Sequence, residues 1–206
     1  IVMILCLYVA IIKLSYLPLV LLPVLLIYKI GKLMNIRFAI LAISIAIIIF
    51  IPWLIRNYIL SGYLIYPFHY LDIFNPDWKI PIKSVIEEEQ IIKNSARGLK
   101  GDYLKSEDIS TVLQYKNWIG IMTYPRVLMI FLAIIGMILP VIRIKKFIHS
   151  YIFLFYLVVT AGFLFWLIIA PDIRFGFPFI VSAIMLPTII FHKKSIYMFY
   201  ILITLI

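Results

Sequence analysis

Four ionisable residues stand at the edges of strongly apolar segments: Lys13, Arg56, Asp172 and Arg174. If those segments cross a membrane, these side chains lie at its boundary, where an unpaired charge is costly. Cations that converge there suit a phosphate or pyrophosphate head group, because arginine offers it a bidentate fork. A plainer reading stays open, in which each cation extends to the interface and Asp172 pairs locally with Arg174.

A second group of polar side chains follows Arg56 along the chain. His69 and Asp72 lie three residues apart, and Asp77 follows a proline. Carboxylates there can act as a general base or bind a metal, although Pro-Asp pairs are also ordinary turn formers. The sequence has no His/Cys ligand spacing and no Gly-rich phosphate loop, so it identifies no metal and no other cofactor, and it leaves a divalent ion open.

Composition indicates which elements must position these side chains. Of the 206 residues, 65% are hydrophobic, which is more apolar surface than a soluble globule of this length can bury. The net charge of +10 is explained better by short basic loops that orient a membrane protein than by nucleic-acid binding. Cys6 is the only cysteine, so no intrachain disulfide is possible. We therefore expect an all-α polytopic membrane protein that contacts membrane lipid and no nucleic acid.

Apolar runs predict about seven transmembrane helices, of which the terminal ones look truncated. A helix needs about 20 apolar residues to cross the hydrocarbon core. The runs are 1–12, 14–28, 38–55, 127–142, 150–169, 177–191 and a last one after residue 194. We expect helices 1–3 in residues 1–55, a loop domain in residues 56–126, and helices 4–7 in residues 127–206. The chain starts without Met and ends inside an apolar run, as a fragment of a longer protein would.

The turns between these runs differ in charge. The turns at 29–37, 143–149 and 192–194 contain eight Lys or Arg residues and no acid. The long loop at 57–126 contains eight basic and eight acidic residues, and is therefore neutral. By the positive-inside rule, the basic turns are cytoplasmic and the long loop lies on the extracytoplasmic face.

The loop domain is expected to be a small cap of short helices. Ser84 with Glu87 matches a capping box and predicts a helix that ends near Gly98. Ser106 is expected to begin a second short helix. Aromatic residues gather at 58–78, where they can stack on sugar rings or form an interfacial belt.

Three short motifs resemble those of a known superfamily. IPWLIRNY at 51–58, continued by SGYLIYP at 61–67, resembles the span-exit motif of bacterial membrane glycosyltransferases of the glycosyltransferase C superfamily. APDIRF at 170–175 is similar to a turn in a poorly characterised branch of that superfamily, and IIKLS at 11–15 is similar to its Lys-bearing turn. The superfamily includes the dolichyl-phosphate-mannose and lipid A aminoarabinose transferases.

The resemblance implies an enzyme of the bacterial inner membrane. Such an enzyme moves a sugar from a polyprenyl-phosphate carrier to a glycan or lipid acceptor of the cell envelope, on the outer face. By carry-over, Lys13, Arg56 and Arg174 would bind the carrier phosphate, and Asp172 would orient Arg174 or the acceptor. The family's catalytic carboxylate lies in an N-terminal outer loop that this sequence lacks, so the resemblance assigns no catalytic residue here.

Other classes of membrane protein stay open. A polymerase or ligase of the O-antigen type also has a large outer loop and outer arginines, but it takes a glycan linked through pyrophosphate. A transporter is less favoured, because no predicted span carries an acidic residue in its interior. A membrane subunit without catalysis is compatible with every pattern above.

Overall fold

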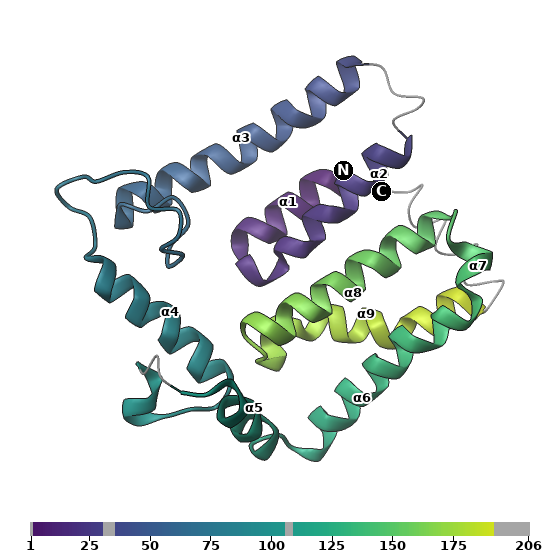
Figure 1. The fold of residues 1–206 in the computed structure, drawn as a ribbon. Helices are drawn as coiled ribbons and strands as arrows, with labels where there is room; N and C mark the ends of the chain where they lie inside the picture. Colours follow the sequence, from purple (N-terminus) through teal and green to yellow (C-terminus); the bar gives the residue numbers. More distant parts are fainter. Residues whose placement is uncertain (1, 31–35, 106–108, 192–206) are drawn as a thin grey trace.

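The structure is a computed structural model that describes residues 2–30, 36–105 and 109–191, and these residues form helices and connecting loops with no strand among them (Figure 1). In chain order the helices are α1 (Val2–Ile12), the 3-10 helix η1 (Leu14–Val20), α2 (Leu21–Ile30), α3 (Ile36–Ser61), α4 (Ile82–Ala96), η3 (Gly101–Leu104), α5 (Thr111–Gly120), α6 (Tyr124–Ile138), η4 (Leu139–Arg143), α7 (Ile144–Phe147), α8 (Tyr151–Ile169) and α9 (Ile173–Phe191).

Four of the described helical segments are long and apolar enough to cross a membrane: Ile40–Ser61, Tyr124–Arg143, Tyr151–Ile169 and Ile173–Phe191. The all-helical prediction therefore holds for the described residues, and the segments are compatible with an integral membrane protein. The first two predicted spans correspond to shorter apolar helices, Val2–Ile12 and Leu14–Lys29. The predicted seventh span, the turn at 192–194 and most of the turn at 29–37 lie outside the described residues.

The helix that contains the third predicted span extends beyond the predicted boundary. Helix α3 passes through Pro52 and continues to Ser61, beyond the expected boundary at residue 55. A proline removes one helical hydrogen bond, and in an apolar span that loss does not by itself end the helix. Residues Leu54, Ile55 and Ile59 extend the apolar pattern past it. The loop therefore begins at Gly62.

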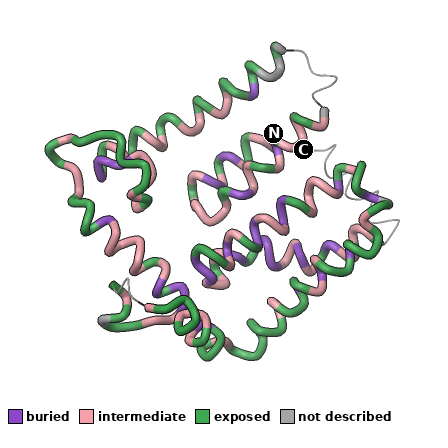
Figure 2. Tube along the Cα trace, viewed as in Figure 1, coloured by how far each residue is buried: buried purple, intermediate pink, exposed green. Residues whose placement is uncertain are grey.

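Close packing of α6, α8 and α9 forms the core. The buried positions, shown in purple in Figure 2, gather on α8 and α9. At Gly136 a Cβ atom would lie 2.1 Å from the backbone oxygen of Ala183, and at Gly162 it would lie 2.1 Å from the ring of Phe179. Small residues thus allow these helices to approach, as is usual where helices pack in lipid.

The turns of the bundle gather at two opposite ends. At one end Lys13 donates a hydrogen bond from Nζ to the carbonyl oxygen of Arg174 (2.9 Å), which joins the α1–η1 turn to the α8–α9 turn. At the other end Lys29 bonds to the carbonyl of His149 and lies 4.7 Å from the ring centroid of Tyr151. Figure 1 shows α5 on the side of the first end, and α2 and α7 on the other. We refer to these as the Lys13 end and the Lys29 end.

The loop between α3 and α6 contains two α-helices in its described part, and neither begins as predicted. Helix α4 starts at Ile82, directly after Pro81, and no side chain caps it. The capping box at Ser84 is therefore wrong, because the helix begins at Ile82 and Ser84 falls inside its first turn. Ser106 lies outside the described residues, and α5 is capped by Ser110, whose Oγ accepts from Leu113 N at 3.4 Å.

The predicted end of α4 is confirmed. The helix closes at Ala96, and Gly98 follows with a φ of +76°. A left-handed residue just after a helix is a usual terminator, and glycine adopts it without strain.

Candidate functional site

The turn between α8 and α9 places Asp172 at the start of α9. Pro171 does not continue α8, and Asp172 Oδ1 accepts a hydrogen bond from the backbone N–H of Arg174 at 2.9 Å. The carbonyl oxygen of Asp172 accepts from the N–H of Phe175, also at 2.9 Å. An aspartate at this position satisfies helix N–H groups and complements the positive end of the helix dipole.

The same carboxylate holds the guanidinium of Arg174. Nε lies 3.2 and 3.1 Å from the two carboxylate oxygens, and Nη2 lies 2.6 Å from Oδ2. The side chain of Arg174 is 81% exposed, whereas that of Asp172 is 21% exposed. The local pair considered in the plainer reading is thus present. Its geometry also orients the guanidinium, and Nη1 is left without a hydrogen bond to any described residue.

Lys13 joins this pair from the N-terminal part of the chain. Beyond its bond to the carbonyl of Arg174, Nζ lies 4.7 Å from the ring centroid of Phe175 and 5.2 Å from that of Tyr16. Aromatic faces stabilise an ammonium group by their quadrupole. Lys13, Asp172 and Arg174 therefore come together although 161 residues separate Lys13 from Arg174.

Arg126, in the first turn of α6, is a further cation that sequence reasoning missed. Partial burial raises the pKa of Asp172, but the hydrogen bonds and charge of Arg174, together with the charge of Arg126, hold that pKa below its ordinary value. In the sequence, Arg126 is one of eight basic residues in a neutral loop. Its position directly before a predicted span is the signal that could have distinguished it from the others. We call Lys13, Arg126, Asp172 and Arg174 the cationic cluster.

Arg56 is not brought into this cluster. It lies exposed on α3, a helix that packs chiefly against α1, and it forms no hydrogen bond or ion pair within the described part of the chain. The structure therefore separates Arg56 from the other two predicted phosphate-binding cations.

His69 and Asp72 also lie apart from the cationic cluster, in the loop that follows α3. His69 Nδ1 lies 2.8 Å from Glu89 Oε2, and Asp72 pairs with Lys79. Each side chain thus has its own partner. Among residues 2–30, 36–105 and 109–191, no group of three His, Cys, Asp or Glu side chains is placed to hold a metal ion.

Arg97 supports the cluster from the loop, and sequence reasoning missed it. The residue is only 5% exposed. Its Nη2 donates to the carbonyl of Ile168 (2.6 Å) and its Nη1 approaches that of Ile169 (3.4 Å), at the C-terminal end of α8. The last carbonyls of a helix have no helical partner, and a cation complements the negative end of the dipole.

Aromatic side chains donate to three further carbonyls at the end of α8 and in the α8–α9 turn. Tyr115 Oη donates to Leu167 at 2.9 Å, and Trp118 Nε1 donates to Pro171 at 2.6 Å. Trp166 Nε1 donates to the carbonyl of Asp172, also at 2.6 Å. The turn that carries Asp172 and Arg174 is therefore held by Trp166 of α8 and by Trp118 of α5. Such support keeps charged groups in place before a ligand binds.

Comparison with known proteins gives one result. No curated protein and no solved structure matches the chain. A family described as "Domain of unknown function (DUF8201)" matches residues 1–181, which include all four members of the cationic cluster. The chain belongs to this family.

Proposed function

We propose that the chain is part of a membrane glycosyltransferase that takes a sugar from a polyprenyl-phosphate carrier and passes it to a glycan or lipid acceptor of the cell envelope. One observation carries the proposal: three cations gather at the α8–α9 turn with a single carboxylate among them. Arg174 pairs with Asp172, the charge of Arg126 acts on Asp172, and Lys13 bonds to the carbonyl of Arg174. The excess of positive charge at a membrane boundary suits a lipid phosphate, whose chain remains in the bilayer.

Each residue has a role in this proposal. Arg174 presents its exposed guanidinium to the phosphate, in an orientation set by Asp172. Lys13, between α1 and η1, and Arg126, on α6, add charge without needing a bidentate geometry. As the bond from sugar to phosphate breaks, negative charge grows on the departing phosphate, and fixed cations stabilise it. The base that activates the acceptor is not assigned to any residue of this chain.

The proposed topology follows from the grouping of the turns. Seven spans cross the bacterial inner membrane, the basic turns of the Lys29 end face the cytoplasm, and the Lys13 end with the loop at 57–125 faces outward. This orientation rests on the positive-inside rule. It is supported by the contacts that gather the turns at Lys13 and Arg174 at one end, and those at Lys29 and His149 at the other.

Binding of a polyprenyl phosphate to the protein in nanodiscs tests the proposal. Arg174→Gln and Arg126→Gln should each raise the dissociation constant by about tenfold, since each removes one charge-assisted contact. Uncharged polyprenol should bind weakly to every variant. Lys100→Gln, in the loop, is the matched control, and Arg56→Gln should behave like it. Unchanged phosphate binding in both cluster variants would contradict the proposal.

A second candidate is supported by the same excess of charge. Three cations also suit the pyrophosphate that links the glycan in polymerases and ligases of the O-antigen type. A polyprenyl diphosphate that binds at least about tenfold more tightly than the monophosphate would favour this candidate. Equal binding would favour the monophosphate carrier.

A further inference from the structure

The loop between α3 and α4 folds back on itself. The N–H of Ile80 donates to the carbonyl of Ser61 (3.1 Å), and Ser61 Oγ accepts from Tyr63 N (3.2 Å). Between them Gly62 has a φ of +81°, and a Cβ there would lie 2.8 Å from Cγ of Lys79. Only glycine adopts this φ without strain and leaves room for Lys79, so the fold-back of the loop depends on Gly62.

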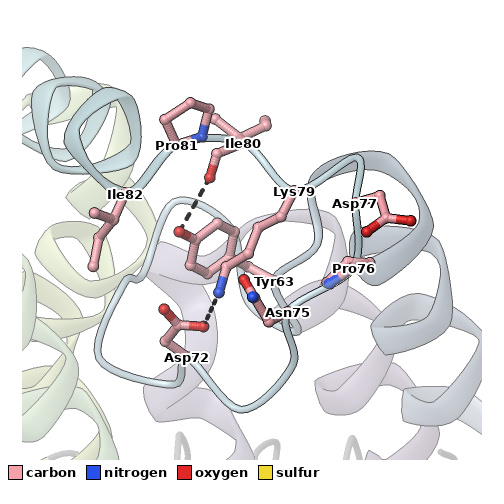
Figure 3. A pocket seen from close by; sticks show the side chains of 9 residues that line it. All are labelled: Tyr63, Asp72, Asn75, Pro76, Asp77, Lys79, Ile80, Pro81 and Ile82. Carbon is pink, nitrogen blue, oxygen red and sulfur yellow. Dashed lines mark hydrogen bonds and ion pairs between the residues drawn. The ribbon is translucent and has the colours of Figure 1, made fainter.

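The folded loop forms a hollow of about 440 Å³ that is open to solvent, drawn in Figure 3. Tyr63, only 1% exposed, is buried among the residues that line it, and its Oη donates to the carbonyl of Ile80 at 3.2 Å. Lys79 Nζ lies 5.0 Å from the centroid of the Tyr63 ring and bonds to Asp72. The charges of Lys79 and Asp72 therefore offset each other, and the hollow has no excess of positive charge for a phosphate.

Two polar side chains at the rim of the hollow are free of described partners, and an exposed aromatic residue outside the lining follows them in the chain. Asn75 and Asp77 line the hollow, are exposed, and make no side-chain hydrogen bond to any residue that the structure describes. Trp78 follows directly and is 58% exposed. Its ring meets Tyr58 edge-on at 6.2 Å, and Tyr58 in turn meets Phe74 at 5.2 Å. The aromatic side chains thus support one another while much of Trp78 stays open.

The geometry points to a binding site for a pyranose ring. A sugar ring presents an apolar face of C–H groups that packs on an aromatic side chain, and hydroxyl groups that pair with an amide and a carboxylate. The volume lies within the range of small-ligand sites, roughly 300–1,000 Å³. A metal ion is not favoured, because Asp72 is already paired with Lys79. The hollow shares no residue with the cationic cluster, so sugar binding stands apart from the proposed function. If the bound sugar belongs to the glycan acceptor, that role rests on the proposed function.

Ligand-observed saturation-transfer NMR on the detergent-solubilised full chain tests this site. The probes are the methyl glycosides of glucose, mannose and N-acetylglucosamine. At least one should receive saturation from the protein. Asn75→Ala and Asp77→Ala should each weaken its binding by about tenfold, the effect of losing one or two polar contacts to the sugar. Trp78→Ala should remove transfer to the C–H face.

Controls separate this inference from its alternatives. Tyr103→Ala removes an aromatic ring that is 62% exposed outside the hollow, and should leave glycoside binding unchanged. Arg174→Gln should weaken binding of polyprenyl phosphate only, so the two sites can fail independently. No transfer to any of the three glycosides, or equal transfer in all variants, would overturn the inference. So would quenching of Trp78 by brominated lipids in nanodiscs, since the ring would then lie in the bilayer.

Discussion

Helices α8 and α3 are both apolar and long enough to cross a membrane, yet the rest of the protein contacts them very differently. In the most apolar window of α8, 39% of the residues are buried inside the protein, against 6% in that of α3. Helix α8 packs against α9 and η1, and α5 satisfies carbonyls at its end. Helix α3 rests chiefly on α1.

The contrast shows that hydropathy and packing are separate properties of a span. Hydrophobic helices gain little from contacting each other in lipid, so close approach through small residues decides which ones associate. Gly162 on α8 and Gly136 on α6 fit directly against α9. Helix α3 has no glycine, and its exposed isoleucines are suited to lipid.

Filling the contact between α6 and the backbone of α9 should have the largest effect. Gly136→Val places a side chain against the backbone of α9, which cannot rotate away, and we expect a loss of about 3 kcal/mol in the free energy of unfolding. The fraction that remains monodisperse after heating in detergent measures it. Ser44→Val adds similar bulk at an exposed position of α3 and should change little. Equal effects of the two variants would contradict the contrast.

Removing the buried arginine should have a smaller effect, confined to one end. Arg97→Met leaves the last carbonyls of α8 without their donor, and we expect a loss of about 2 kcal/mol. Limited proteolysis should also cut the loop at 99–105 faster in this variant. Lys100→Met, which changes an exposed cation of the same loop, is the control. If both variants resist proteolysis like the unaltered chain, Arg97 does not hold the loop to α8.

Shortening an exposed side chain of α3 should have the smallest effect. Ile48 is 69% exposed, and Ile48→Ala should change the free energy of unfolding by less than about 0.5 kcal/mol. The same heating assay measures it. A loss close to that of Gly136→Val would mean that another protein surface covers α3, and the contrast with α8 would then be incomplete.

Local features were predictable from the sequence and distant ones only in part. The pairing of Asp172 with Arg174 was among the stated readings, because the residues lie two apart. The contact between Lys13 and the α8–α9 turn depends on helix packing, which hydropathy does not encode. For the same reason Arg56 was grouped with the cluster and Arg126 was not.

Arg97 shows most clearly which contacts cannot be predicted from the sequence. In a neutral loop an arginine is normally solvated, and nothing around Arg97 in the sequence marks it as buried. Its partners are backbone carbonyls, which any sequence supplies, so no complementary residue signals the contact. The continuation of α3 past residue 55 and the start of α4 were missed for a related reason, since Pro52 lies inside one helix and Pro81 directly precedes the other.

The contacts of the loop with the linker after α8 also impose an order on biogenesis. Arg97, Tyr115 and Trp118 leave the ribosome before the carbonyls at 167–171 that they bind. The loop cannot complete its contacts until α8 and the turn that follows it have been synthesised and have folded. A chain in which α8 and this turn do not fold therefore leaves Arg97, Tyr115 and Trp118 without the carbonyls that they bind.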